Sequence, residues 1–226
     1  MQNTDSEGVV LGNDDFKRLP RQKEDNSYII YDLSTISDYS VAQKIEQSSN
    51  LNFKDWLAMA KLPWVEKEPI IAIAKKLAKL ARTSTEIRKT FLLPKLWSDY
   101  GQEDYSLEIK KEMEKQNKVS HETCVEVLRH YETHKKEDEN VCPTLKIVIM
   151  KKALITSKSP ETFLNSRIVR NWKYATELSL REINWPIEKW RLIVDSHIPT
   201  EFKIIAQQKI ITIRKAGSNQ QLISQA

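Results

Sequence analysis

Lysine and arginine side chains recur at helical spacing in two segments of the chain, within 75–89 and within 167–181. Arrays of this kind favour the phosphate backbone of RNA or DNA, because neutralising phosphates releases the counterions around them. Two aromatic residues beside the second array, Trp172 and Tyr174, are suited to stacking on unpaired bases. We therefore predict that the nucleic-acid-binding residues are Lys75, Lys76, Lys79, Arg82, Arg88, Lys89, Arg167, Arg170, Lys173 and Arg181.

The same basic segments have two other interpretations. One is a solvated helix surface with the tryptophans in the core. The other is a helix-turn-helix over 73–91, because IAKKLA followed by TSTEIRK has the small and apolar residues that open such motifs. This pattern departs from the motif in its turn, which contains no glycine, and at Lys79 and Ser84, where apolar residues are usual.

Histidines and cysteines gather between 121 and 142, and imidazole and thiolate are both zinc ligands. His121 with Cys124, and His130 with His134, have spacings that bring two side chains onto one helical face. Cys124 and His130 are six residues apart, about 240° around a helix, so the two pairs point in different directions. Cys142 follows without a C-x-x-C motif, and we predict no metal site.

The sequence contains none of the short motifs that mark common enzymes, such as Gly-rich phosphate loops, H-E-x-x-H or G-x-S-x-G. Asp104, Glu108 and Lys110 resemble a nuclease triplet, but such triplets arise by chance in a chain of which 30% is charged. No histidine is paired recognisably with a serine or cysteine nucleophile. We therefore predict a protein without catalytic residues and without a cofactor.

The composition of the 226 residues excludes several structural classes. Hydrophobic residues make up 40%, and only four glycines occur, so the tight turns of an all-β protein have little to build on. Two cysteines are too few for a disulfide scaffold, and no apolar run approaches the roughly 20 residues that span a bilayer. We predict an intracellular protein, cytoplasmic or nuclear, outside the membrane. Abundant Ile, Lys and Asn are typical of an AT-rich genome, a viral one among others.

Charge is distributed unevenly along the chain, whose net charge is +5. Basic residues exceed acidic ones by six between 61 and 98 and by eight between 141 and 226, whereas acidic residues lead by five between 99 and 140. A fold that joins the basic segments forms a positive surface, and a fold that packs the acidic segment beside them neutralises that surface. The sequence leaves both outcomes open.

Helix start and stop signals place the first basic array. Asn52 has the residue type and position of an N-cap. Thr83 and Glu86 have the spacing of a capping box ahead of a second helix, which Pro94 is expected to end. Pro63 is expected to end the helix capped by Asn52, and Pro69 fits the first turn of the next one. The first array therefore lies on the helix that begins near Pro69 and on the helix that follows Thr83.

The second basic array follows an apolar run at 145–155, which has the β-branched residues of a strand but the length of a helix. We predict a helix there. Ser159 and Pro160 open the next helix, whose apolar face is expected to continue without a break through Leu164, Ile168, Trp172 and Ala175.

These elements predict an all-α fold, an irregular multi-helix bundle with room for two helical halves and a disordered N-terminal arm. The predicted divisions are a disordered arm at 1–27, a helical subdomain with a basic helix at 28–98, acidic polar helices at 99–140, a basic helical subdomain at 141–215 and a flexible tail at 216–226.

We expect a non-enzymatic protein with a packaging or accessory role that holds RNA or DNA by the phosphate backbone. The alternative is a helical protein–protein interaction or self-assembling scaffold module. In that case the basic helices meet an acidic protein partner or a second copy of the chain, as a homo-oligomer, and the tryptophans anchor the interface.

Overall fold

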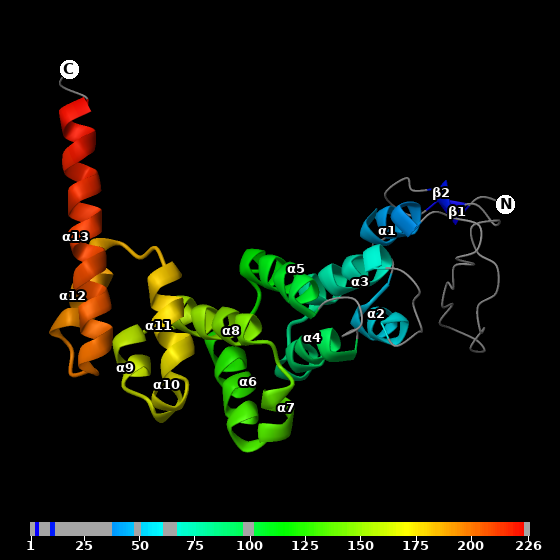
Figure 1. Cartoon of the computed structure of the whole chain (residues 1–226), viewed down its shortest axis with the longest axis horizontal. Coiled ribbons are helices and arrows are strands. Elements are labelled where there is room, and N and C mark those ends of the chain that lie inside the picture. Colours follow the sequence, from blue (N-terminus) through cyan, green and yellow to red (C-terminus); the bar gives the residue numbers. More distant parts are fainter. Residues whose placement is uncertain are drawn as a thin grey trace. The chain divides into compact units, whose positions relative to one another are not determined.

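The chain is all-α, as predicted from its sequence (Figure 1). The computed structural model describes residues 3–4, 10–11, 38–47, 51–60, 67–96 and 102–223. Within them lie a two-residue antiparallel pair, β1 (Asn3–Thr4) and β2 (Val10–Leu11), and thirteen helices. The helices are α1 (Asp38–Gln47), α2 (Phe53–Met59), α3 (Lys67–Leu80), α4 (Ser84–Leu96), α5 (Gln102–Lys115), α6 (His121–Thr133), α7 (Lys135–Glu139), α8 (Pro143–Thr156), α9 (Pro160–Leu164), α10 (Arg167–Asn171), α11 (Lys173–Glu182), α12 (Ile187–Asp195) and α13 (Thr200–Ile223).

The chain divides into two compact units, Met1–Gln116 and Asn117–Ala226. The first unit is organised around α3, which packs against α1, α2, α4 and α5. One face of α3 is buried through Ile70, Ile73, Ala74 and Leu77, whose spacing is that of an amphipathic helix. This burial holds α3 in the centre of its unit and leaves its lysines on the remaining faces.

Side-chain caps stabilise the starts of two helices in the first unit, α2 and α4. Asn52 accepts hydrogen bonds from the backbone of Lys54 and Asp55, and the Asp55 carboxylate accepts from the Asn52 N–H in return. The predicted capping box between Thr83 and Glu86 is also present. These caps satisfy backbone donors that a helix leaves without partners at its start.

The end of α3 is closed by a side chain from further along the chain. The buried Gln116 amide donates from Nε2 to the carbonyls of Ala78, Lys79 and Ala81, at 2.8, 3.2 and 2.8 Å. Carbonyls at a helix end have no intrahelical partner, so this contact ties the segment after α5 to the end of α3.

The second unit is built on α8, which packs against α6, α9 and α11, while α13 packs against α11 and α12. Side chains all round α8 are buried, among them Leu145, Val148, Ile149 and Leu154. This burial explains why the run lacks an amphipathic pattern in the sequence. The predicted helix at 145–155 is confirmed, since α8 spans Pro143–Thr156.

Two predicted helix boundaries are wrong. The apolar face expected to run unbroken from Leu164 to Ala175 is divided among α9, α10 and α11. The break arises because the Ser166 hydroxyl accepts a hydrogen bond from the Val169 N–H and so starts a new helix. The helix expected to end at Pro94 continues to Leu96 as α4.

Of the arm predicted at 1–27, the structure describes only the four residues of β1 and β2, and its predicted disorder falls outside the described residues. The tail predicted at 216–226 overlaps the last turns of α13, and 224–226 lie outside the described residues. No helix in the described ranges has both the length and the apolar character needed to cross a membrane.

Candidate functional site

The lysines of α3, from the first predicted basic array, meet carboxylates of their own unit. Lys75 Nζ lies 2.7 Å from Glu46 Oε1 of α1 and 3.8 Å from Glu108 Oε2 of α5. Partial burial lowers the pKa of Lys75, but the hydrogen bond to Glu46 and the charges of Glu46, Glu108 and Glu112 outweigh it, and the pKa is raised. The cleft beside Lys75, of about 300 Å³, is therefore lined by both signs of charge.

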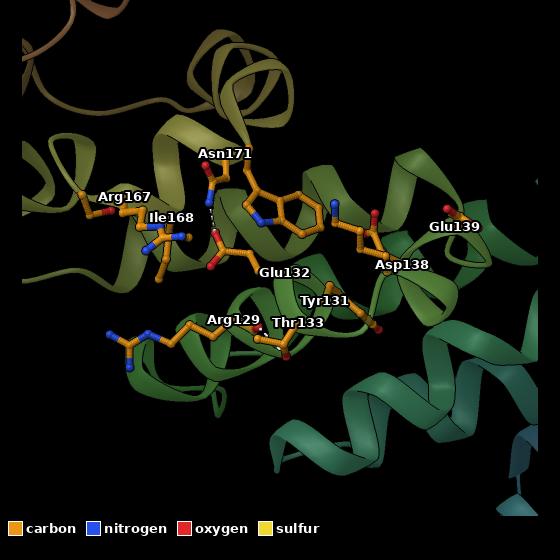
Figure 2. A pocket seen from close by; sticks show the side chains of 12 residues that line it. Arg129, Tyr131, Glu132, Thr133, Asp138, Glu139, Arg167, Ile168 and Asn171 are labelled. Atoms are coloured by element: carbon orange, nitrogen blue, oxygen red, sulfur yellow. Dashed lines mark hydrogen bonds between the residues drawn. The ribbon is translucent and has the colours of Figure 1, made fainter.

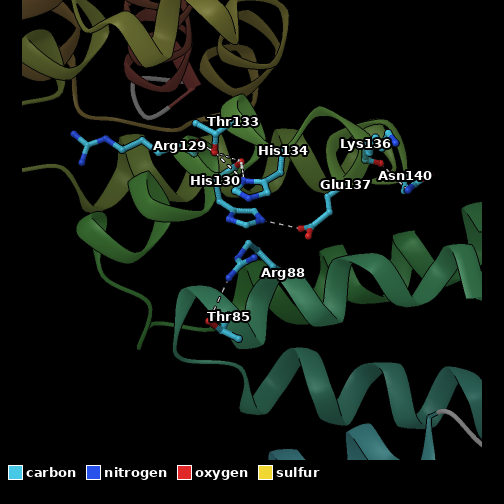
Figure 3. Close-up of polar contacts among 9 residues, drawn as sticks. All are labelled: Thr85, Arg88, Arg129, His130, Thr133, His134, Lys136, Glu137 and Asn140. Carbon is cyan, nitrogen blue, oxygen red and sulfur yellow. Dashed lines mark hydrogen bonds and ion pairs between the residues drawn. The ribbon is translucent and has the colours of Figure 1, made fainter.

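The other members of the first array have varied surroundings. Lys76 Nζ lies 6.0 Å from the ring centroid of Trp56, and the Arg82 guanidinium donates to the carbonyls of Lys79 and Ala81 at the end of α3. Arg88 donates to the Thr85 hydroxyl (Figure 3). The Lys79 and Lys89 side chains are exposed. The first array is thus engaged largely in contacts within its own unit.

The second predicted array is divided among two helices and does not form one stripe. Arg167 and Arg170 are exposed on α10, and Arg170 donates to the Asn165 carbonyl at 3.3 Å. Lys173 of α11 forms a 2.7 Å ion pair with Glu201 of α13. The hydrogen bond and charge of Glu201 raise the pKa of Lys173, and the same hydrogen bond lowers the pKa of Glu201. Arg181 is exposed in the last turn of α11.

A cleft of about 890 Å³ lies between α6, α7 and α10, and we call it the α6–α10 cleft (Figure 2). The Asn171 amide donates to the Glu132 carboxylate at 3.0 Å and so joins α10 to α6. The Tyr131 and Trp172 rings lie 6.4 Å apart between centroids. The cleft is lined by Arg129, Tyr131, Glu132, Thr133, Lys135, Asp138, Glu139, Ser166, Arg167, Ile168, Asn171 and Trp172.

Apart from Glu132, whose carboxylate accepts from Asn171 in the middle of the α6–α10 cleft, the labelled charged side chains lie toward its two ends. Arg129 and Arg167 lie toward one end, and Asp138 and Glu139 lie toward the other (Figure 2). The Asp138 carboxylate is held by Lys146 at 2.7 Å. A ligand with an anionic group at one end therefore has one preferred direction in this cleft.

A second cleft, of about 640 Å³, continues from the basic end of the first. It shares Arg129, Ser166 and Ile168 with the α6–α10 cleft and adds Lys158 from the segment between α8 and α9. We call it the Lys158 cleft. Its lining also contains several hydroxyl groups, and one acidic residue, Glu122.

One side of the Lys158 cleft is held in place by contacts of His121. His121 Nδ1 lies 2.8 Å from the Ala153 carbonyl, and its ring stands edge-on to Phe163 with centroids 4.9 Å apart. Hydrogen bonds from the backbone of Glu122 and from Ser120 lower the pKa of the Glu122 carboxyl, the one acidic side chain in the lining.

Three cations line the two connected clefts: Arg129 lines both, Arg167 lines the α6–α10 cleft and Lys158 lines the Lys158 cleft. Arg129, Lys158 and Arg167 are exposed, and within the described part of the chain none of them forms an ion pair. Guanidinium groups present planar sets of donors that match phosphate oxygens, and an ammonium adds a compact charge. Each of these side chains is chemically suited to contact a phosphate oxygen.

Arg129, Lys135 and Lys158 line these clefts but were not among the residues predicted from the sequence. Arg129 and Lys135 belong to the acidic segment 99–140, so its net charge conceals them. One signal was available for Arg129. It directly follows Leu128 in a helix whose buried face includes Cys124, Leu128 and Tyr131, and a residue beside such a stripe borders any neighbouring groove.

His130 and His134 lie at the junction of α6 and α7. The His130 and His134 rings are stacked with centroids 3.8 Å apart, and His130 Nε2 lies 2.8 Å from Glu137 Oε2 of α7 (Figure 3). Among the described residues, no group of three or more His, Cys, Asp or Glu side chains is placed to hold a metal ion.

Burial raises the pKa of the Cys124 thiol to about 12, from an unfolded value near 9. The folded chain binds this proton more tightly, so the contribution of Cys124 to stability is intact below about pH 9 and is lost as pH rises toward 12. We expect the free energy of unfolding to fall by up to about 1.4 kcal/mol per pH unit in this range, relative to Cys124→Ala. Urea titrations of both proteins between pH 8 and 11 measure the difference, and identical pH profiles would contradict the prediction.

No protein-family model, curated protein or solved structure matches this chain in comparisons of its sequence and fold.

Proposed function

We propose that this chain is a non-enzymatic protein, with a packaging or accessory role, that binds the phosphate backbone of RNA or DNA through its second unit. The observation that carries the proposal is the set of three cations without ion-pair partners in the described residues, Arg129, Lys158 and Arg167, that line the two connected clefts. Because these cations are not paired with carboxylates, a phosphate can bind them without first breaking an existing ion pair.

The two basic arrays contribute differently to this proposal. Lys75 and Lys173 are each paired with a glutamate, so phosphate would have to displace a carboxylate from them. Arg167 has no such competitor among the described residues and lies in the α6–α10 cleft. The binding surface therefore centres on α6 and α10. Its positive charge attracts the phosphate groups of the nucleic acid.

Salt dependence of binding tests this function. Fluorescence anisotropy of the full chain with labelled RNA and DNA oligonucleotides is measured at several salt concentrations. Three phosphate contacts predict that the logarithm of the binding constant falls against the logarithm of salt concentration with a slope of about −2 to −3. Binding that is absent at low salt, or that does not change with salt, contradicts the proposal.

A second candidate function, self-association as a helical scaffold, is supported by α13. Ile204 and Ile211 are seven residues apart and therefore share a face, and their side chains are 48% and 53% exposed. This face lies opposite the buried Phe202 and Ala206, and α13 extends well beyond α12 (Figure 1). A second copy that packs its α13 here would bury both isoleucines.

Light scattering after size exclusion tests the scaffold function at several protein concentrations. We expect a dimer for the unchanged chain and a monomer for Ile211→Glu, because the charge would be buried at the helix contact. Thr212→Glu, at an exposed position of α13 about 100° around the helix from Ile211, is the matched control and should stay dimeric. A monomer for the unchanged chain at every concentration contradicts this candidate.

A further inference from the structure

Tyr174 is the most exposed of the large hydrophobic side chains in the described residues, at 71%. It stands in the first turn of α11, two residues after Trp172. Burial of an aromatic ring is favourable, and the exposed Tyr174 ring lacks this contribution. A ligand that covers the ring therefore gains free energy from the apolar area it buries.

Tyr174 is one of the residues that line a small pocket of about 260 Å³. Its lining shares Asp138, Asn171 and Trp172 with the α6–α10 cleft. The other lining residues are Pro143, Lys146, Ile147, Tyr174 and Ala175. The pocket is thus a continuation of the cleft, with a lining of both apolar and polar side chains.

Trp172 cannot itself serve as an open stacking surface. The Lys146 ammonium lies 5.5 Å from its ring centroid, and Tyr131 packs nearby on the same ring. Lys146 is in turn held by the Asp138 carboxylate at 2.7 Å. Of the two aromatic residues beside the second basic array, only Tyr174 therefore offers an uncovered ring face.

The order of groups along the connected surface matches the chemistry of a nucleotide. Arg129 and Arg167 lie at the basic end of the cleft and suit a phosphate, whereas Asp138 lies at the opposite end, where the pocket begins. A nucleobase has a flat apolar face that the Tyr174 ring can contact. An extended nucleotide chain can present both groups at once.

We propose that Tyr174 and this pocket form a stacking site for one unpaired base, so that the nucleic acid bound by this chain is single-stranded. The inference rests on the function proposed above. A duplex keeps its bases stacked on one another and presents only its backbone to a shallow surface, so it gains the phosphate contacts but not the contact with Tyr174. The single strand is therefore bound more tightly than a duplex of the same sequence.

Three proteins test the stacking site: the full chain, Tyr174→Ala and Tyr174→Phe. Anisotropy titrations use one labelled oligonucleotide, either alone or annealed to its complement, at a single salt concentration. Loss of one stacked base predicts that Tyr174→Ala binds the single strand at least about fivefold more weakly. Tyr174→Phe keeps the flat ring and should bind as the unchanged chain does, and duplex binding should be alike for all three proteins.

Leu192→Ala is the control for removing an exposed apolar side chain, since Leu192 lies on α12 and is 58% exposed. It should leave both affinities unchanged. Equal weakening of single-strand and duplex binding by Tyr174→Ala, no weakening, or tighter duplex binding by the unchanged chain would each overturn the stacking site and leave the proposed function standing. Failure of the unchanged chain to bind either ligand would overturn both.

Discussion

The double substitution Arg129→Glu and Arg167→Glu is expected to weaken nucleic-acid binding about 100-fold at moderate salt. Hydrogen bonds to charged groups contribute roughly 1.5 kcal/mol or more each, and two such contacts correspond to about two powers of ten. The log–log dependence on salt should also become shallower by about two units, because two fewer phosphates are neutralised. Anisotropy titrations over a range of salt concentrations give both quantities.

The matched control is Arg181→Glu with Arg191→Glu. Arg181, which the sequence pattern predicted as a binding residue, and Arg191 are exposed on α11 and α12 of the same unit and line neither cleft, so a site in the clefts predicts no phosphate contact for either. The substitutions change the net charge by the same amount as in the first double variant. Long-range repulsion alone should then weaken binding only about threefold. If the two double variants lose affinity equally, binding follows net charge and the α6–α10 cleft has no special part in it.

Trp190→Ala is expected to destabilise the second unit by about 3–5 kcal/mol, the usual cost of removing a large aromatic side chain from a core. Trp190 is fully buried, and its ring lies 5.0 Å from the ring of Trp185 between centroids. It fixes α12, which packs against α9 and α13. The truncated side chain leaves a cavity that the surrounding helices cannot close without strain.

Urea unfolding followed by circular dichroism measures this loss of stability. Leu192→Ala provides the control on the same helix, because its exposed side chain should contribute less than about 0.5 kcal/mol. A loss below about 1 kcal/mol for Trp190→Ala would contradict the packing of α12 described above.

Local signals in the sequence predicted the helices well where a side chain acts on its own backbone. Asn52 and the Thr83–Glu86 pair are such cases, since each cap is complete within four residues. The helix at 145–155 was also predicted correctly, because its length, its lack of helix-breaking residues and its helical neighbours favoured a helix over a strand. The break after Leu164 was missed because apolar spacing describes one face of a helix and does not register the hydroxyl of Ser166, which starts a new one.

The candidate site was only partly predictable, because its members meet through tertiary structure. The pairing of Lys75 with Glu46 joins residues 29 positions apart, and no local pattern indicates it. Arg129 and Arg167 come from segments of opposite net charge and line one cleft only because α6 packs beside α10. The excess of basic residues between 141 and 226 therefore pointed to Arg167, whereas the excess of acidic residues between 99 and 140 concealed Arg129.

Chemical footprinting of arginines tests the central claim most directly. The unchanged chain is treated with an arginine-specific reagent such as phenylglyoxal, with and without a single-stranded oligonucleotide at low salt, and modification of each arginine is measured by mass spectrometry. We predict that the oligonucleotide protects Arg129 and Arg167 and leaves Arg181 and Arg191 unchanged. Uniform modification at all four arginines, or protection confined to Arg82 and Arg88 of the first unit, would contradict a phosphate-binding site in the α6–α10 cleft.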